Sequence, residues 1–166
     1  MRGGPRGSSD QVAWLGPKYV EFVAAANLDP VHFDESASGP QTAFFLPFFP
    51  VEEGYKVNRI ILAVTETYAA TGTNLVVGTN ASGSGNVFVN NYNVPNSTGQ
   101  GSIIDVPLNG AGGGKDPLAT GNSAYLVGGS SSQQLTASLT AGSTGNNGAF
   151  KLFAELIPVT GSRFSD

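Results

Sequence analysis

Few side chains in this sequence could act in catalysis or bind a metal. The chain contains no cysteine and a single histidine, His32, in 166 residues. Without cysteine there are no disulfides and no thiolate metal sites, and one histidine cannot build a multi-histidine metal centre. His32 lies close in sequence to Asp34 and Glu35, and we interpret it as a residue of a surface loop. We therefore expect no metal and no cofactor.

The carboxylates are the next candidates for chemistry. Asp34–Glu35 and Glu52–Glu53 form adjacent pairs, whereas Asp105 and Asp116 are isolated. Two acids that meet across loops could cleave a glycosidic bond or hold calcium. The alternating acidic spacing of an EF-hand loop is absent. We therefore interpret these acids as solvated residues that flank strands.

Two short motifs approximate catalytic loops. Gly112–Lys115 is similar to the end of a phosphate-binding loop, but Asn109 stands where that motif needs glycine and Asp116 where it needs serine or threonine. Ala141–Gly145 approximates the turn that exposes a nucleophilic serine, but it separates two expected strands rather than a strand and a helix. We therefore predict that the protein is not an enzyme.

Aromatic residues offer a different kind of site. Tyr68, Tyr92 and Tyr125 lie near strand ends or turns, where they could stack on a sugar ring. Phe88 lies inside an alternating strand, which is typical of a core residue. A sugar-binding surface, as in a fibre or adhesin head, is therefore the alternative that these tyrosines leave open.

The elements that must position these side chains are short. Apolar or alternating stretches, separated by runs of Gly, Ser, Thr and Asn, continue from residue 57 to the C-terminus. This rhythm predicts antiparallel strands joined by turns. Together with the Phe-rich segment before them, we expect about eight strands: Thr42–Phe49, Val57–Thr67, Thr73–Thr79, Asn86–Tyr92, Ser102–Leu108, Ser123–Gly128, Gln133–Thr140 and Ala149–Val159.

Alternation is clearest in the second and the last of these segments. Successive strand side chains point to opposite faces, so one set of alternate residues should face the core. In the second strand we expect that set to be Ile60, Leu62 and Val64, with Arg59 and Ile61 on the other face. In the last strand we expect it to be Phe150, Leu152, Ala154 and Leu156, opposed by Lys151, Phe153, Glu155 and Ile157.

The fold that we predict is all-β. About eight antiparallel strands without a long helix fit a two-sheet β-sandwich, and several loops are long for hairpins, which favours a jelly-roll-like arrangement. We assign residues 42–166 to the sandwich. Residues 1–41 are predicted to form an extended N-terminal arm, in which residues 19–28 have room for a short helix or a strand.

Apolar side chains outside the predicted core are candidates for partner contacts. Pro47 cannot donate to a central ladder, so Thr42–Phe49 should be an edge strand, a bulge or two strands at a bend. Large apolar side chains gain about 1.5–3 kcal/mol each on burial, so an apolar arm should find a groove of its own or of a neighbour. The expected contact residues are Trp14, Leu15, Tyr19 and Phe22 in the arm and Phe44, Phe45, Phe48 and Phe49 at the edge.

Charge is low and unevenly distributed. Charged residues make up 12% of the chain, whereas about 25% is usual. The first eighteen residues carry +2 of the formal net charge of −4, so the remainder carries −6. The basic arm could dock onto an acidic subunit or nucleic acid, or be a disordered start, but we expect no nucleic acid on the acidic β domain. No apolar run is long enough to predict a membrane span.

From Tyr55 onward, the order of segments resembles that in small all-β structural proteins of tailed bacteriophages, above all the head decoration or cement proteins. Four strings carry the resemblance, with turns between them: IILAVT, LVVGT, LTASLTAG and the closing AELIPV. The resemblance covers about two thirds of the chain and leaves out residues 1–41. Similar strings occur in phage tail and fibre components, which stay open as alternatives.

The resemblance implies a function at surfaces. It implies a non-enzymatic virion protein, made in the host bacterial cytoplasm, that binds the major capsid protein on the outer capsid lattice and stabilises contacts between capsomers. Such proteins are commonly jelly-roll or related sandwiches and often homotrimers. We expect the arm to make lattice contacts or to exchange with a neighbouring copy. Uncharged loops suit this role because burying them avoids the desolvation cost of ions.

Overall fold

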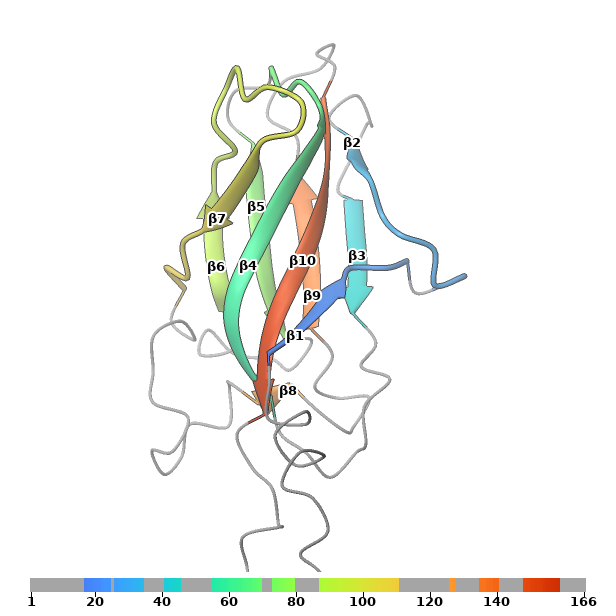
Figure 1. Ribbon diagram of the computed structural model, residues 1–166, viewed down its shortest axis with the longest axis vertical. Helices are drawn as coiled ribbons and strands as arrows, with labels where there is room; N and C mark the ends of the chain where they lie inside the picture. The colour runs from blue at the N-terminus through green and yellow to red at the C-terminus, as the bar shows by residue number, and fades with distance from the viewer. Residues whose placement is uncertain are drawn as a thin grey trace, which may run out of the picture.

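The computed structural model describes residues 17–24, 26–34, 41–45, 55–69, 73–79, 87–110, 126–127, 135–140 and 148–158. These ranges contain strands and no helix (Figure 1). The ten strands are β1 (Lys18–Glu21), β2 (Phe33–Asp34), β3 (Gln41–Phe45), β4 (Tyr55–Glu66), β5 (Asn74–Thr79), β6 (Val87–Tyr92), β7 (Ile103–Val106), β8 (Leu126–Val127), β9 (Leu135–Thr140) and β10 (Ala149–Pro158). Each of the eight segments predicted as strands overlaps one, although β3 and β4 begin one and two residues before the predicted starts.

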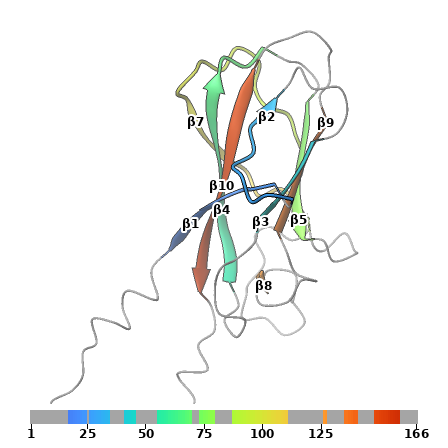
Figure 2. The ribbon, with the colours of Figure 1, turned by 90° about the vertical axis from the view of Figure 1, so that its right-hand side faces the viewer.

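The strands form two antiparallel sheets that face each other (Figure 2). The six-stranded sheet has the order β1-β10-β4-β7, with β2 added beside β10 and β8 beside β4. The four-stranded sheet has the order β3-β9-β5-β6. The predicted two-sheet antiparallel β-sandwich is therefore confirmed.

The pairing of strands is nested. The hairpin partners β5 and β6 pair with each other, and then β4 pairs with β7, β3 with β9 and β1 with β10. Two further pairings, β10 with β4 and β9 with β5, join these pairs into sheets. The described strands thus form nested antiparallel pairs, with β5–β6 innermost, that are arranged in two layers.

The core lies between the two sheets. Alternation along β4 and β10 places Ile60, Leu62, Leu152 and Leu156 in it, all fully buried, which confirms the predicted inward faces. From the four-stranded sheet, the buried partners are Ala43, Leu75, Val77, Phe88, Val89, Leu135, Ala137 and Leu139. The alternation works because each sheet has one face against the other layer.

The N-terminal boundary of the sandwich differs from the prediction. Residues 18–21 and 33–34 are strands of the six-stranded sheet, so the division into an arm of residues 1–41 and a sandwich of residues 42–166 is corrected. The Phe22 amide donates to the Leu152 carbonyl at 3.0 Å, and Phe33 pairs with Phe150. Both phenylalanines are fully buried because this stretch supplies an edge of the layer that covers the core.

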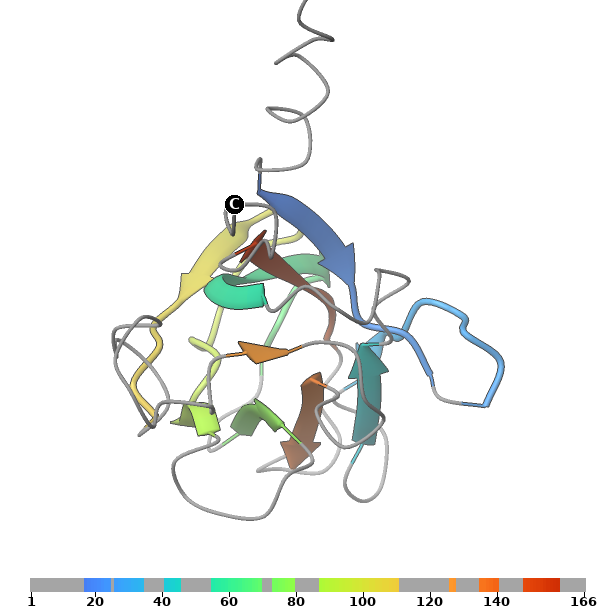
Figure 3. The same ribbon diagram turned by 90° about the horizontal axis from the view of Figure 1, so that it is seen from below.

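Between β1 and β2 the chain leaves the sheet and returns. Phe22 bonds to Leu152 of β10 and Phe33 pairs with Phe150, only two residues away on the same strand, so the chain between them must loop out. We call this loop, residues 23–32, the excursion; it is the blue loop in Figure 3. Val23 bridges to Pro30, and the Ala24 amide donates to the Asp29 carbonyl at 2.9 Å. The excursion is therefore a hydrogen-bonded projection from the sheet edge.

Two sheet edges are informative. In the described residues β3 lies at the end of its sheet, so Thr42–Phe49 contains an edge strand as predicted, although it ends at Phe45. At the opposite end, β6 is covered by the residues after β7: Asn109 accepts from the Asn90 amide at 2.8 Å and donates to its carbonyl at 3.0 Å. The Gly110 amide donates to the Phe88 carbonyl at 2.9 Å. These bonds protect an edge that could otherwise pair with another chain.

Candidate functional site

The face of the six-stranded sheet that points away from the core carries charged, aromatic and aliphatic side chains. We call it the outer face. Its residues alternate with the buried ones along four strands, so that side chains distant in sequence become neighbours. The outer face comprises Tyr19 and Glu21 of β1, Lys151, Phe153 and Glu155 of β10, Arg59, Ile61 and Ala63 of β4, and Ile103 and Asp105 of β7.

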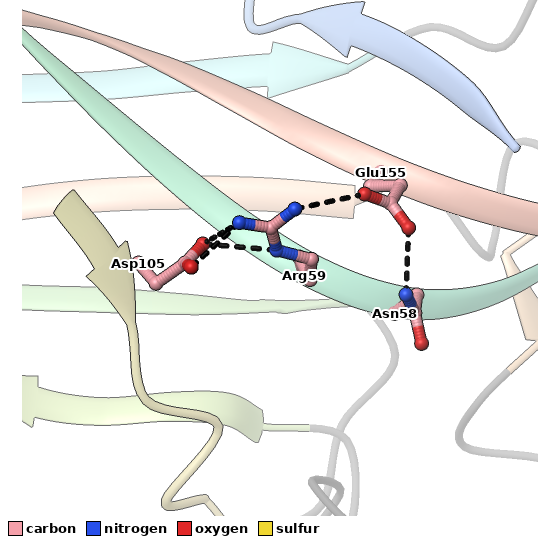
Figure 4. A network of polar contacts seen from close by, with 4 residues as sticks. All are labelled: Asn58, Arg59, Asp105 and Glu155. Atoms are coloured by element: carbon pink, nitrogen blue, oxygen red, sulfur yellow. Dashed lines mark hydrogen bonds and ion pairs between the residues drawn. The ribbon is translucent and has the colours of Figure 1, made fainter. Parts of the chain in front are cut away.

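Arg59 is the centre of a polar network on this face (Figure 4). Its Nη2 lies 2.5 Å from Asp105 Oδ2, and its Nε donates to Asp105 Oδ1 at 3.0 Å. Its Nη1 lies 3.5 Å from Glu155 Oε2, while Asn58 Nδ2 donates to Glu155 Oε1 at 2.6 Å. Tyr19 of β1 lies opposite Glu155 across the ladder, and the interaction of its hydroxyl with that carboxylate shifts the pKa of both groups. The hydrogen bonds and ion pairs of the network join β10, β4 and β7.

A β-bulge positions the Asn58 side chain. The register between β10 and β4 shifts at this point: Glu155 pairs with Arg59, but Leu156 pairs with Val57, which leaves Asn58 without a partner across the ladder. A bulge adds one residue to one strand and redirects its side chain. Two consecutive residues of β4 therefore reach one carboxylate.

Glu155 is the buried member of the network, with 5% of its surface exposed. Burial acts to raise the pKa of the Glu155 carboxyl, but hydrogen bonds from Tyr19 and Asn58 and the charge of Arg59 outweigh it and lower the pKa. Bonding to Asp105 raises the pKa of Arg59, and bonding to Glu155 raises the pKa of Tyr19. The three shifts all favour a charged carboxylate, a charged guanidinium and a neutral phenol.

This arrangement is suited to holding strands together. A general acid or base works best when its pKa lies near the operating pH, whereas the pKa of Glu155 is moved further away. Both of its oxygens are occupied by donors, and Asp105 receives the Arg59 fork. The exposed Arg59–Asp105 pair contributes little to stability, because solvent screens the two charges. The network positions charges on the face and offers no free carboxylate for catalysis.

We predict that Glu155 makes folding sensitive to acid. Its pKa is lower in the folded than in the unfolded chain, so its contribution is fully present above the ordinary value of 4.5 and is lost as the pH falls through the folded pKa. Urea denaturation midpoints of the wild type and of Glu155→Gln should therefore differ at neutral pH and converge below pH 4.5. A gap between the two proteins that stays constant on acidification would contradict this role of the carboxylate.

An apolar row crosses the outer face beside the network. Phe153 of β10 lies directly opposite Ile61 of β4, and Ala63 lies opposite Ile103 of β7. The first three are half-buried, but Ile103 is 75% exposed. Solvent-exposed apolar side chains that adjoin one another mark interaction surfaces. We define Phe153, Ile61, Ala63 and Ile103 as the apolar row.

The excursion of residues 23–32 is a second surface feature. Leu28 is 42% exposed there and adopts φ of 59°, a left-handed conformation that is uncommon for a leucine. Its amide donates to the Ala24 carbonyl at 2.9 Å, and the Asn27 side chain bonds to Asp29. The exposed leucine is therefore presented on a turn that its neighbours fix.

The structure places the predicted contact residues in different environments. Tyr19 is 59% exposed on the outer face, which leaves it available to a partner. Phe22 is fully buried in its own core, so its predicted role as a partner contact is corrected to a core role, because β1 covers this chain's own second layer. Phe44 and Phe45 belong to the edge strand β3. The remaining four, Trp14, Leu15, Phe48 and Phe49, lie outside the described residues.

The residues tested for chemistry do not converge where the structure describes them. His32 is exposed beside β2, and the Asp34 amide donates to Gln41 Oε1 at 2.7 Å. No group of three potential metal ligands occurs within the described ranges. Glu35 and the pair Glu52–Glu53 lie outside these ranges. So do Asp116 and the two loop motifs, Gly112–Lys115 and Ala141–Gly145.

Two of the three tyrosines considered for sugar stacking lie within the described residues, and both pack into or against the core. Tyr68 is fully buried, and its hydroxyl lies 2.8 Å from Thr73 Oγ1, so it cannot stack on a sugar at the surface. Tyr92 is half-buried against the core, and burial raises the pKa of its hydroxyl. Tyr125 lies outside the described residues. Phe88 is a core residue, as predicted.

Comparisons with protein-family models, with curated proteins and with solved structures found no match for this chain. In the part of the chain that the structure describes, no helix is long and apolar enough to cross a membrane.

Sequence reasoning placed Arg59 and Glu155 on outward faces but did not join them. The available signal was a pair of opposite charges near the middle of the two longest alternating segments. Pairing them requires the register of β10 against β4, two strands about ninety residues apart, and a bulge that the alternation does not reveal.

Proposed function

We propose that this protein is a non-enzymatic structural protein of a phage virion: a decoration or cement protein that binds the major capsid protein on the outer capsid lattice and acts as a homotrimer. The observation that carries the proposal is the nested strand pairing. Nested pairing of the strands in two four-strand orders supports a jelly-roll arrangement, an architecture that is frequent in viral capsid proteins. The sequence resemblance to decoration proteins points the same way.

The surface chemistry supports a role in assembly. The charges on the outer face that lie nearest the apolar row are paired within the chain: Arg59 with Asp105 and Glu155, and Lys151 with Glu21 at 3.1 Å. Charges already paired add less desolvation cost when a partner covers them than free ions do. Many copies on a lattice then turn modest contacts into a durable shell by multivalency.

The test is co-sedimentation of the full-length protein with shells assembled from the major capsid protein of the same source. We expect the protein to pellet with the shells, to saturate at a fixed ratio of copies per capsomer and to raise the temperature at which the shells break. Protein that stays in the supernatant at all concentrations would overturn the proposal.

A truncation separates the role of the arm from that of the sandwich. Deletion of residues 1–16 leaves β1 complete, since that strand begins at Lys18. We expect this variant to fold, because β1 keeps its pairing with β10, and to bind shells more weakly than the full chain. Equal binding by both chains would show that the sandwich alone makes the lattice contacts.

A further inference from the structure

The apolar row on the outer face is a surface that apolar side chains could contact. Ile103 is 75% exposed, and Tyr19, beside the row, is 59% exposed. The chain carries its own apolar segment just before β1, where Trp14 and Leu15 stand three and two residues ahead of Pro17. Tryptophan is one of the side chains that most often dominate the binding energy of a protein contact.

The geometry at Pro17 decides which copy supplies the cover. Along β1, Glu21 lies opposite Phe153 and Tyr19 lies opposite Glu155, so the chain moves away from the apolar row towards its N-terminus. Pro17 would be next to Ile157, but it has no amide hydrogen, which ends the ladder.

A tight reversal at this point is disfavoured. Lys18 is already a strand residue and cannot be the centre of a turn. Proline at the third position of a type I turn would force the preceding residue out of the backbone conformation that the turn requires. A residue before proline, here Gly16, favours an extended backbone. A chain that continues in the direction of β1 therefore moves away from the row by about 3.3 Å per residue.

We propose that Trp14 and Leu15 of one copy cover the apolar row of a second copy, Phe153, Ile61, Ala63 and Ile103. The inference rests on the homotrimer of the proposed function and names the contact that forms it. When each copy donates its segment to the next, the head-to-tail contacts close into a ring of three. The segment then acts as a clasp between subunits.

The chain provides its own probe, because Trp14 is the only tryptophan. The full-length protein is diluted in the absence of capsid shells, while its mass is followed by light scattering and the Trp14 emission and quenching by iodide are recorded. We expect a mass of three subunits with blue-shifted, protected emission at high concentration. On dilution to the monomer, the emission should shift to the red and become accessible to iodide.

A mixing experiment tests the donation between copies. Ile103→Asp breaks the row at an exposed site and should give a monomer with water-exposed Trp14 emission, whereas the control Leu28→Asp, at an exposed leucine on the excursion, should behave as the wild type. Trp14→Ser keeps the row but lacks the probe. An excess of Trp14→Ser added to Ile103→Asp should shift the emission to the blue.

Three results would overturn the inference: water-exposed Trp14 at all concentrations, protected Trp14 in the monomer, or no shift on mixing. These measurements contain no shells, so they are independent of the co-sedimentation test. If the protein binds shells but Trp14 is exposed to water, the clasp is refuted and the decoration function stands. If the protein forms a trimer with protected Trp14 but does not bind shells, the clasp stands and the decoration function is refuted.

Discussion

Replacing Phe150 with alanine is expected to lower the free energy of unfolding by about 3–5 kcal/mol, a large part of the stability of a small domain. The ring is fully buried, stacks on Phe33 at a centroid distance of 5.2 Å and meets the edge of Tyr68 at 5.8 Å. Alanine would remove both contacts and leave a cavity. Urea denaturation at one protein concentration measures the loss, and Phe150→Leu should lose less because it fills more of the space.

The same ring tests the corrected boundary of the domain. Phe33 comes from the stretch that the sequence assigned to an arm, and it pairs with Phe150 across β2 and β10. In a double-mutant cycle, Phe33→Ala and Phe150→Ala should couple by about 0.5–1.5 kcal/mol, since they share one stacked contact. Phe153→Ala, on the outer face, should show no coupling to Phe33→Ala. Additive losses for the first pair would contradict a shared core.

The sequence was informative wherever a strand signals itself locally. In β4 and β10, alternation predicted which residues are buried, because one face of each strand lies against the second layer. An edge strand was one of the three readings that Pro47 allowed for its segment, and β3 lies at the end of its sheet within the described residues. The composition of these segments was enough to predict a two-sheet sandwich.

What depends on pairing over long distances was not predictable. β1 and β2 are four and two residues long and are separated by the excursion, so neither shows a period of its own. They become strands because β10, more than one hundred residues later, offers an edge. The polar network has the same origin, since Glu155, Arg59 and Asp105 meet only in one register of three strands. Register is set by the packed layers rather than by any single segment.

Management of the sheet edges links the fold to the proposed assembly. A sandwich that works among many identical neighbours must associate through selected surfaces and not through open ladders, which would pair indiscriminately. Pro17 directly precedes β1 and stops its ladder on that side. β6 is covered by Asn109 and Gly110. The outer face and the excursion then remain as surfaces on which contacts can be specific. The edge cover is therefore a feature whose removal should change both stability and association.

Gly110→Ala is expected to cost about 1–3 kcal/mol of unfolding free energy, in the range of an overpacked site. A Cβ at this position would lie 2.1 Å from the Val87 carbonyl oxygen and 2.9 Å from the Phe88 carbonyl carbon. Both are backbone atoms, so β6 or the covering segment must move apart, which breaks the Gly110–Phe88 bond and strains the two bonds of Asn109 to Asn90.

The matched control is Gly99→Ala, where an added Cβ meets nothing within 4 Å. Its urea midpoint should stay close to that of the wild type, within about 0.5 kcal/mol. Light scattering over time should show slow aggregation of Gly110→Ala alone, because its β6 edge is open to pairing with other chains. If the two alanine variants had equal stability and equal scattering, residues 109–110 would not be protecting this edge. A loss confined to Gly110→Ala would instead identify residues 109–110 as a cover that keeps other chains from pairing with the β6 edge.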